Sequence, residues 1–208
     1  MVTVADHPVL VHRVAVLRDK DTDRDSFRQV ISEISGFLAY EALRDLGMTD
    51  AIIDTPVTSG AAVRKVNENV LVVPILRAGL GMVQAIQEVV PLTEVAHVGL
   101  RRDEETLHSE VYLNRLPKSL EGRRVIVCDP MVATGGSLVQ VCDLVRARGA
   151  REVIALCIIA SEPGLATFGA AHPTVRVFCA AVDPELNAVG YIVPGLGDAG
   201  DRLFGPPD

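Results

Sequence analysis

Short, continuous runs of apolar residues alternate along most of the chain with stretches in which apolar residues recur every three or four positions. The apolar runs are VLVVPIL (70–76), EVAHVGL (94–100), RRVIVCD (123–129), REVIALCIIA (151–160) and TVRVFCAAVD (174–183). The helical spacing predicts helices at 22–46, 80–90, 137–148 and 163–170. Apolar strands separated by helices are typical of an α/β fold in which both faces of a parallel sheet are covered.

Three segments depart from this alternation. Residues 51–67 alternate in short pieces and predict a hairpin, and the residues before 22 predict an arm that caps the fold. The stretch RRDEETLHSEVYLNRLP (101–117) is polar, with little helical period. A long polar excursion between strands predicts a flap or hairpin near the ligand. The alternative is a solvated β-arm without a role.

Composition and charge narrow the class of protein. The chain has 208 residues, 49% of them apolar and none of them Trp, which fits one domain over 1–208 with an aliphatic core. The net charge of −7 argues against a general nucleic-acid binder. The N-terminal residues lack the order of a signal peptide, and no apolar run is long enough for a membrane span. We expect a cytoplasmic protein without membrane or nucleic-acid partners, whose four cysteines are reduced core residues.

The first candidate site is DPMVATGGS (129–137), which follows the strand predicted at 123–129. Its TGGS segment opens a helix, and the free amides and dipole of a helix N-terminus favour an anion. The lysine of a P-loop is missing, and taken alone the turn fits an ordinary capped connection equally well. Asp129 directly before the turn favours a ligand with hydroxyls beside its phosphate, such as ribose 5-phosphate.

Cations follow two other predicted strands. Arg77 comes directly after the strand at 70–76, and Arg101 and Arg102 follow the strand at 94–100. Ligands of open parallel sheets bind beyond the carboxyl ends of the strands, so these arginines suit a second phosphate or a diphosphate. In isolation, Arg77 also fits a solvated loop.

A glycine-rich segment, GYIVPGLGDAGDR (190–202), contains a literal GxGxxG. A dinucleotide fingerprint opens a helix in a βαβ unit and has an acid about 20 residues further on, and this context is missing. We therefore expect an irregular loop whose backbone groups reach a small polar ligand, or else a tail without a role. The five histidines show no metal spacing, and no GxSxG elbow is present.

Seven segments together resemble the uracil phosphoribosyltransferase family over nearly the whole chain. They are, in order, HPVLVHRVAVLRDKDT, FRQVISEISGFLAYEALRD, VVPILRAGLGM, HVGLRRDEETL, VYLNRLP, DPMVATGGS and GYIVPGLGDAGDR. The resemblance implies the type I phosphoribosyltransferase fold, with a central, mostly parallel sheet flanked by helices. It also implies a β-arm flap at about 102–116 and a small C-terminal hood that binds the base at about 183–208.

The resemblance also implies a reaction and a set of site residues. The family joins uracil to 5-phospho-α-D-ribose 1-diphosphate (PRPP), giving UMP and diphosphate in pyrimidine salvage. The implied PRPP-binding residues are Arg77, Arg102, Asp129, Pro130, Met131, Val132, Ala133, Thr134, Gly135, Gly136, Ser137 and Asp198. The implied uracil-binding residues are Ile192, Gly197, Asp198 and Ala199. Asp198 and Arg102 are the catalytic candidates.

Cofactor, effector and assembly follow from the same resemblance. The family uses Mg²⁺ carried with PRPP. Pro130 stands where related transferases often place a second acid, so we expect ligand oxygens and water, with few protein groups, to hold the metal. Family members form dimers or larger assemblies and some respond to GTP, which makes a homo-oligomer and a GTP effector expectations here. Two alternatives are an RNA-binding attenuator on the same fold and a purine phosphoribosyltransferase.

Overall fold

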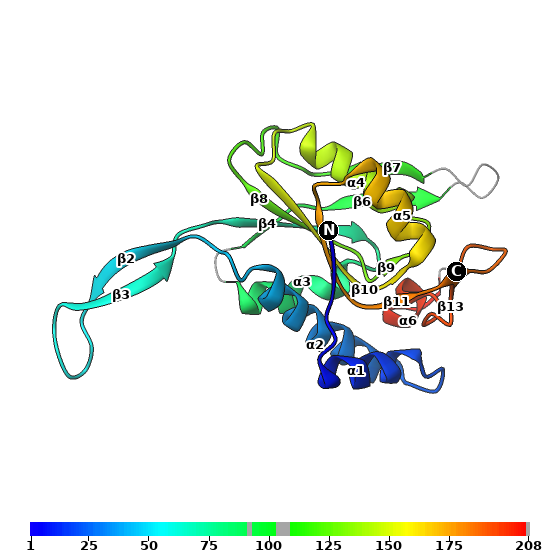
Figure 1. Ribbon diagram of the computed structural model, residues 1–208, viewed down its shortest axis with the longest axis horizontal. Helices are drawn as coiled ribbons and strands as arrows, with labels where there is room; N and C mark the ends of the chain where they lie inside the picture. The colour runs from blue at the N-terminus through cyan, green and yellow to red at the C-terminus, as the bar shows by residue number, and fades with distance from the viewer. Residues whose placement is uncertain (91–92, 103–108, 207–208) are drawn as a thin grey trace.

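The computed structural model describes residues 1–90, 93–102 and 109–206, and a mostly parallel β-sheet forms its centre (Figure 1). The strand order is β1-β11-β10-β8-β4-β6-β7, and every neighbouring pair on this path is parallel except β6–β7. The strands are β1 (Val2–Val4), β4 (Val70–Leu76), β6 (Val98–Arg102), β7 (Ser109–Asn114), β8 (Arg124–Cys128), β10 (Glu152–Ser161) and β11 (Arg176–Asp183). Two short strands lie beside this path, β5 (Glu94–Val95) on β4 and β9 (Met131–Val132) on β10. The predicted parallel sheet is confirmed.

Helices cover both faces of the sheet, as the apolar strands require. On one face lie α1 (Pro8–Arg18), α2 (Arg24–Ala42) and α3 (Leu80–Val89), and on the other lie α4 (Gly136–Arg146) and α5 (Glu162–Ala171) (Figure 1). Successive side chains of a strand point to opposite faces. Val70 and Val72 therefore pack in the core under α2, whereas Leu71 and Val73 pack in the core under α4. The two aliphatic cores hold the carboxyl ends of the strands in fixed positions.

Several boundaries differ from those predicted. The N-terminal arm contains β1, which pairs with β11, and α1, whose N-cap His7 accepts a hydrogen bond from the Val9 amide. The helix predicted at 22–46 is α2, which has Asp23 as its N-cap and ends at Ala42. The strand predicted at 94–100 is interrupted, with β5 and β6 as its two parts.

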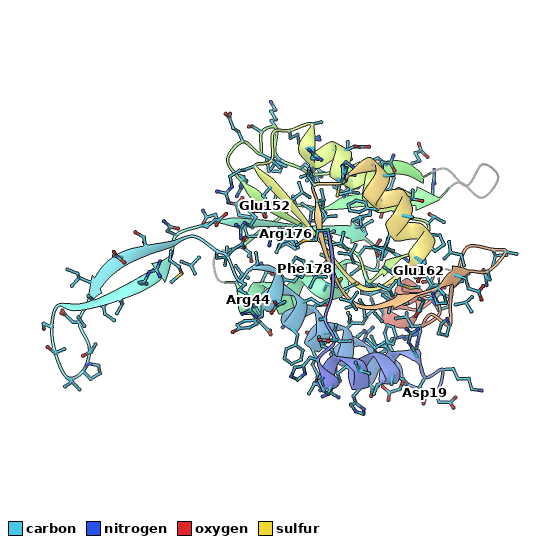
Figure 2. All side chains as sticks on the ribbon, in the orientation of Figure 1. Asp19, Arg44, Glu152, Glu162, Arg176 and Phe178 are labelled. Atoms are coloured by element: carbon cyan, nitrogen blue, oxygen red, sulfur yellow. The ribbon has the colours of Figure 1, made fainter. Side chains whose placement is uncertain are left out.

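The predicted hairpin is present as β2 (Met48–Ile53) and β3 (Ala61–Val66), which form an antiparallel pair that projects away from the sheet (Figure 1). An ion cluster lies at its base, where β8, β10 and β11 begin. Arg124 is 5% exposed and contacts three carboxylates, those of Asp45, Glu68 and Glu152. Figure 2 shows Glu152 beside Arg176 in this cluster. These contacts tie the base of the projecting hairpin to the amino end of the sheet.

The other irregular regions also contain regular structure. Strands β6 and β7 form an antiparallel hairpin at the predicted flap, and residues 103–108 of that flap lie outside the described residues. After β11 come β12 (Glu185–Leu186), β13 (Ile192–Val193) and the short helix α6 (Ala199–Phe204). The expectation of an irregular loop at 190–202 was therefore wrong in part, because GLGDAG opens α6. The four cysteines are buried and free, as predicted. None of the described helices has the length and apolar character needed to cross a membrane.

Candidate active site

Asp129 lies at the carboxyl end of β8, near the middle of the sheet. Its amide donates to the Leu156 carbonyl (3.1 Å), and its carboxylate accepts from the Met131 amide (3.3 Å). Burial raises the pKa of Asp129 to about 7. The Met131 hydrogen bond opposes this rise, and the negative charge of Asp198 adds to it. The sheet thus holds a carboxylate in a position that disfavours its ionised form until a ligand compensates the charge.

The loop after Asp129 forms a small cavity at the N-terminus of α4. The cavity has a volume of about 140 Å³ and is lined by Asp129, Met131, Val132, Ala133, Thr134, Gly135, Ser137 and Leu138. Gly135 is the N-cap of α4 and has φ +83°. A Cβ atom at Gly135 would lie 2.5 Å from the Gly164 carbonyl oxygen. Only glycine fits this tight, left-handed position, which lets the backbone approach an anion closely.

Helix α5 supports this loop from behind. The Ser161 hydroxyl donates to the Ala133 carbonyl (2.5 Å) and accepts from the Gly164 amide (2.9 Å). Ser161 is therefore the N-cap of α5 and also holds the loop that lines the cavity. The sequence interpretation missed this residue, although SEPG (161–164) carries the serine and proline of a helix start.

Arg77 follows β4 and points toward the C-terminal segment. Its peptide bond with Leu76 is cis, and its guanidinium contacts the Asp201 carboxylate at 3.1 Å. Half of its side chain is exposed, so the group remains accessible to a ligand. Arg102 ends β6, and its side chain lies outside the described part of the chain. Its neighbour Arg101 pairs with Glu110 across the flap hairpin and is exposed.

The C-terminal segment brings the remaining candidates to the same edge of the sheet. Ile192 and Ala199 are buried, whereas Gly197 and Asp198 are exposed. Gly197 has φ +80°, and the Asp198 carboxylate caps α6 by accepting from the Asp201 amide (2.9 Å). The Asp198 charge adds to the rise in the pKa of Asp129, so the two carboxylates lie close enough to interact electrostatically.

The donors at this edge suit one kind of ligand. A glycine-rich helix N-terminus binds a phosphate, Asp129 accepts from hydroxyls, and Arg77 adds a second anion contact. The described residues contain no group of three or more His, Cys, Asp or Glu side chains that could enclose a metal ion. The Asp129 carboxylate would still offer the hard oxygen ligand that Mg²⁺ prefers, with most of the other ligands coming from substrate and water. Fold and site together define an α/β protein whose polar groups beyond the carboxyl ends of its strands suit a phosphorylated sugar.

Comparisons with known proteins identify the family. The family model described as uracil phosphoribosyltransferase matches residues 4–206. A protein named uracil phosphoribosyltransferase from Ligilactobacillus salivarius (strain UCC118) is 46% identical over 202 residues, which are 97% of each chain. The chain belongs to the uracil phosphoribosyltransferase family.

Solved structures agree with this assignment. The structure of the AQ2163 protein from Aquifex aeolicus is similar to this chain, with a TM-score of 0.91 and 37% sequence identity. The match covers 99% of this chain and 98% of the AQ2163 chain. A hypoxanthine phosphoribosyltransferase from Staphylococcus aureus has a TM-score of 0.52 at 10% identity, with 76% of each chain covered. The second likeness shows the fold alone. The predicted type I phosphoribosyltransferase fold is confirmed.

Proposed function

We propose that this protein transfers the 5-phosphoribosyl group from PRPP to uracil, forming UMP and diphosphate in pyrimidine salvage. The observation that carries the proposal is the meeting of three elements at one edge of the sheet. These are the phosphate loop with Asp129, the Arg77 guanidinium, and the C-terminal segment that contains Asp198. Family membership supplies the reaction, and these groups supply the chemistry that it requires.

PRPP would lie along this edge with its two phosphate ends apart. Amides and hydroxyls of residues 130–137 would hold the 5-phosphate, and the Asp129 carboxylate would accept hydrogen bonds from the ribose hydroxyls. Arg77 and Arg102 would contact the diphosphate, where negative charge grows as the bond to C1 breaks. No protein nucleophile is needed, because diphosphate departs from C1, the ribosyl group becomes oxocarbenium-like, and N1 of the base attacks C1.

Residues 183–208 would form a hood over the uracil. Backbone groups at Ile192, Gly197 and Ala199 would read the pyrimidine edge and align its N1 with C1 of the ribose. Asp198 would orient or deprotonate the base. The flap at 102–116 would close over the bound substrates and exclude water, which otherwise hydrolyses PRPP.

Mg²⁺ would enter with PRPP as part of the substrate complex. When bound, the ion neutralises charge on the diphosphate. We propose that diphosphate and ribose oxygens and water supply most of its ligands. Asp129 would be the protein carboxylate available to the ion beside the ribose, and Pro130 next to it offers no side-chain oxygen.

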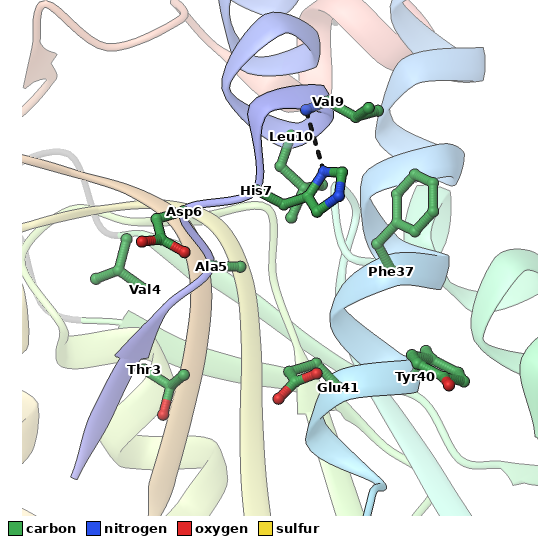
Figure 3. Close-up of a pocket in the computed structure, with 10 residues that line it drawn as sticks. All are labelled: Thr3, Val4, Ala5, Asp6, His7, Val9, Leu10, Phe37, Tyr40 and Glu41. Atoms are coloured by element: carbon green, nitrogen blue, oxygen red, sulfur yellow. Dashed lines mark hydrogen bonds between the residues drawn. The ribbon is translucent and has the colours of Figure 1, made fainter.

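We also propose that the protein is a homo-oligomer. An apolar hollow of about 440 Å³ lies between the N-terminal segment and α2, and its lining includes Val4, Val9, Phe37 and Tyr40 (Figure 3). Phe37 and Tyr40 are 49% and 70% exposed. The projecting β2–β3 hairpin exposes further apolar residues, and two strands alone are marginally stable in water. A second copy of the chain would cover both surfaces.

Sedimentation of two variants tests this assembly. Tyr40→Lys should dissociate the oligomer, whereas Val189→Lys, which changes an exposed apolar residue of the C-terminal segment, should not. A wild-type protein that sediments as a monomer would contradict the proposal.

The four buried thiols fit a reducing compartment, and we propose that the protein is cytoplasmic.

A panel of bases tests the proposed substrate. The protein should form a nucleoside monophosphate from PRPP and Mg²⁺ with uracil, and not with hypoxanthine, guanine or cytosine. Repeating the assay with added GTP determines whether GTP is an effector. A preference for a purine would refute the assignment of uracil while leaving the PRPP site intact.

A further inference from the structure

Two arginines tether the C-terminal segment to the end of α1, a helix that none of the site assignments includes. Arg18 ends α1, and its guanidinium donates to both carboxylate oxygens of Asp183, at 2.7 and 2.6 Å. It also donates to the Gly195 carbonyl at 2.8 Å. The Gly195 amide returns a hydrogen bond to Asp183 at 3.0 Å. Arg18 and Asp183 thus hold the Gly195 peptide groups from both sides.

A tight turn connects Gly195 to the proposed uracil site. Gly195 has φ +62°, and a Cβ atom there would clash with the carbonyl oxygen of Ile192. The turn from 192 to 195 therefore has no spare room. We therefore expect a displacement of Gly195 to shift the Ile192 backbone, which is proposed to read the pyrimidine edge.

Arg202 makes the second tether, from α6. Its guanidinium donates to the carbonyls of Leu17, Leu196 (2.9 Å) and Asp19 (2.7 Å). It also lies 4.1 Å from the centre of the Phe27 ring. The last carbonyls of a helix lack partners within the helix and attract a cation. The end of α1 thus forms a socket for Arg202, one turn along α6 from Asp198.

We propose that Arg18 and Arg202 are positioning residues, and that the end of α1 sets the uracil affinity of the enzyme through them. The inference rests on the uracil-binding residues assigned under the proposed function. The phosphate loop at 130–137 has a separate support, namely Ser161 and the N-terminus of α5. Loss of the Arg18 tether should therefore weaken uracil binding and spare PRPP. The tether requires the planar guanidinium of arginine, because a lysine ammonium group cannot reproduce its hydrogen bonds to two carboxylate oxygens and a carbonyl.

Steady-state kinetics of Arg18→Met and Arg18→Lys test the proposal. The KM for uracil should rise about tenfold or more in Arg18→Met and less in Arg18→Lys, because each lost charge-assisted hydrogen bond is strong. The KM for PRPP should stay within about twofold of wild type on the same argument. Arg13→Met is the matched control, since Arg13 also lies on α1 but pairs with Glu33 of α2. It should leave both KM values unchanged.

Circular dichroism shows which variants fold, and it separates a loss of uracil binding from a loss of structure. If Arg18→Met does not fold, the double variant Arg18→Met/Asp183→Asn removes the unpaired buried charge and carries the same prediction. Equal rises in the two KM values, or an unchanged uracil KM in a folded Arg18 variant, would overturn the inference. A wild-type protein without UMP formation would instead overturn the proposed function, so the two failures are distinguishable.

Discussion

Replacing Asp129 with asparagine should make the unliganded protein more stable and less active at the same time. Burial raises the pKa of this carboxyl from 3.8 to about 7. The folded protein therefore binds the Asp129 proton more tightly than the unfolded chain does. Stability falls as the pH rises from about 4 to 7, and the full cost is present at pH 8. Asparagine is uncharged at every pH and keeps the oxygen that accepts from the Met131 amide.

The expected magnitude follows from the shift in pKa. A rise in the pKa from 3.8 to about 7 corresponds to roughly 4 kcal/mol of unfolding free energy, which is an upper bound. The carboxylate is partly accessible to water, so we expect about 1–2 kcal/mol at pH 8. For a chain of this length that is a rise in Tm of about 3–6 °C. The advantage should become smaller as the pH falls from 8 to 5 and should vanish below about pH 3, where the carboxyl is protonated in both the folded and the unfolded chain.

Urea and thermal unfolding at pH 5 and pH 8, at fixed protein concentration and without ligand, measure this effect. Asp50→Asn is the control, because that carboxylate is 96% exposed on the projecting hairpin. Its effect on stability should not change between pH 5 and pH 8. If Asp129→Asn is neutral or destabilising at pH 8, burial does not disfavour the ionised carboxylate and the reasoning is refuted.

The same variant should lose about 10–100-fold in kcat/KM, since a charge-assisted hydrogen bond to ribose is lost. Unchanged kinetics would refute the role in binding ribose.

Three further predictions concern the phosphate loop, the diphosphate contact and the base of the sheet. Gly135→Ala should cost about 1–3 kcal/mol of stability and most of the PRPP affinity, by thermal unfolding and titration, whereas Gly169→Ala, with open space around its Cβ position, should cost neither. Arg77→Met should raise the KM for PRPP about 10–100-fold with little change for uracil, and an equal change in both would contradict the diphosphate contact. Arg124→Met should destabilise the fold by about 3–5 kcal/mol in urea, because it removes the buried cation that three carboxylates share, whereas the same change at the exposed Arg44 should cost less than about 1 kcal/mol.

The sequence predicted the sheet and the glycine-rich turn that begins α4, because both have local signals. Continuous apolar runs such as 70–76 indicate strands covered on two faces, and DPMVATGGS places a carboxylate and glycines at a strand end. The sheet then brings Asp129 and Arg77 to one edge, as parallel strands must.

The features that were missed depend on long-range contacts. Helix α1 has no clear apolar face in sequence, and its role is visible only where Arg18 contacts Asp183 and Arg202 contacts its end. Helix α6 is short, and Asp198 begins it as N-cap in a segment that read as a glycine-rich loop. Ser161 acts through a carbonyl distant in sequence. No local pattern predicts these pairings, because they form only once the strands have been placed.

The most direct test of the account is the product formed from uracil, PRPP and Mg²⁺ by the purified protein. We expect UMP and diphosphate to appear in equal amounts, at a rate that Asp129→Ala strongly reduces. Absence of UMP, or release of diphosphate without UMP, would contradict the central claim that this edge of the sheet joins the ribosyl group to uracil.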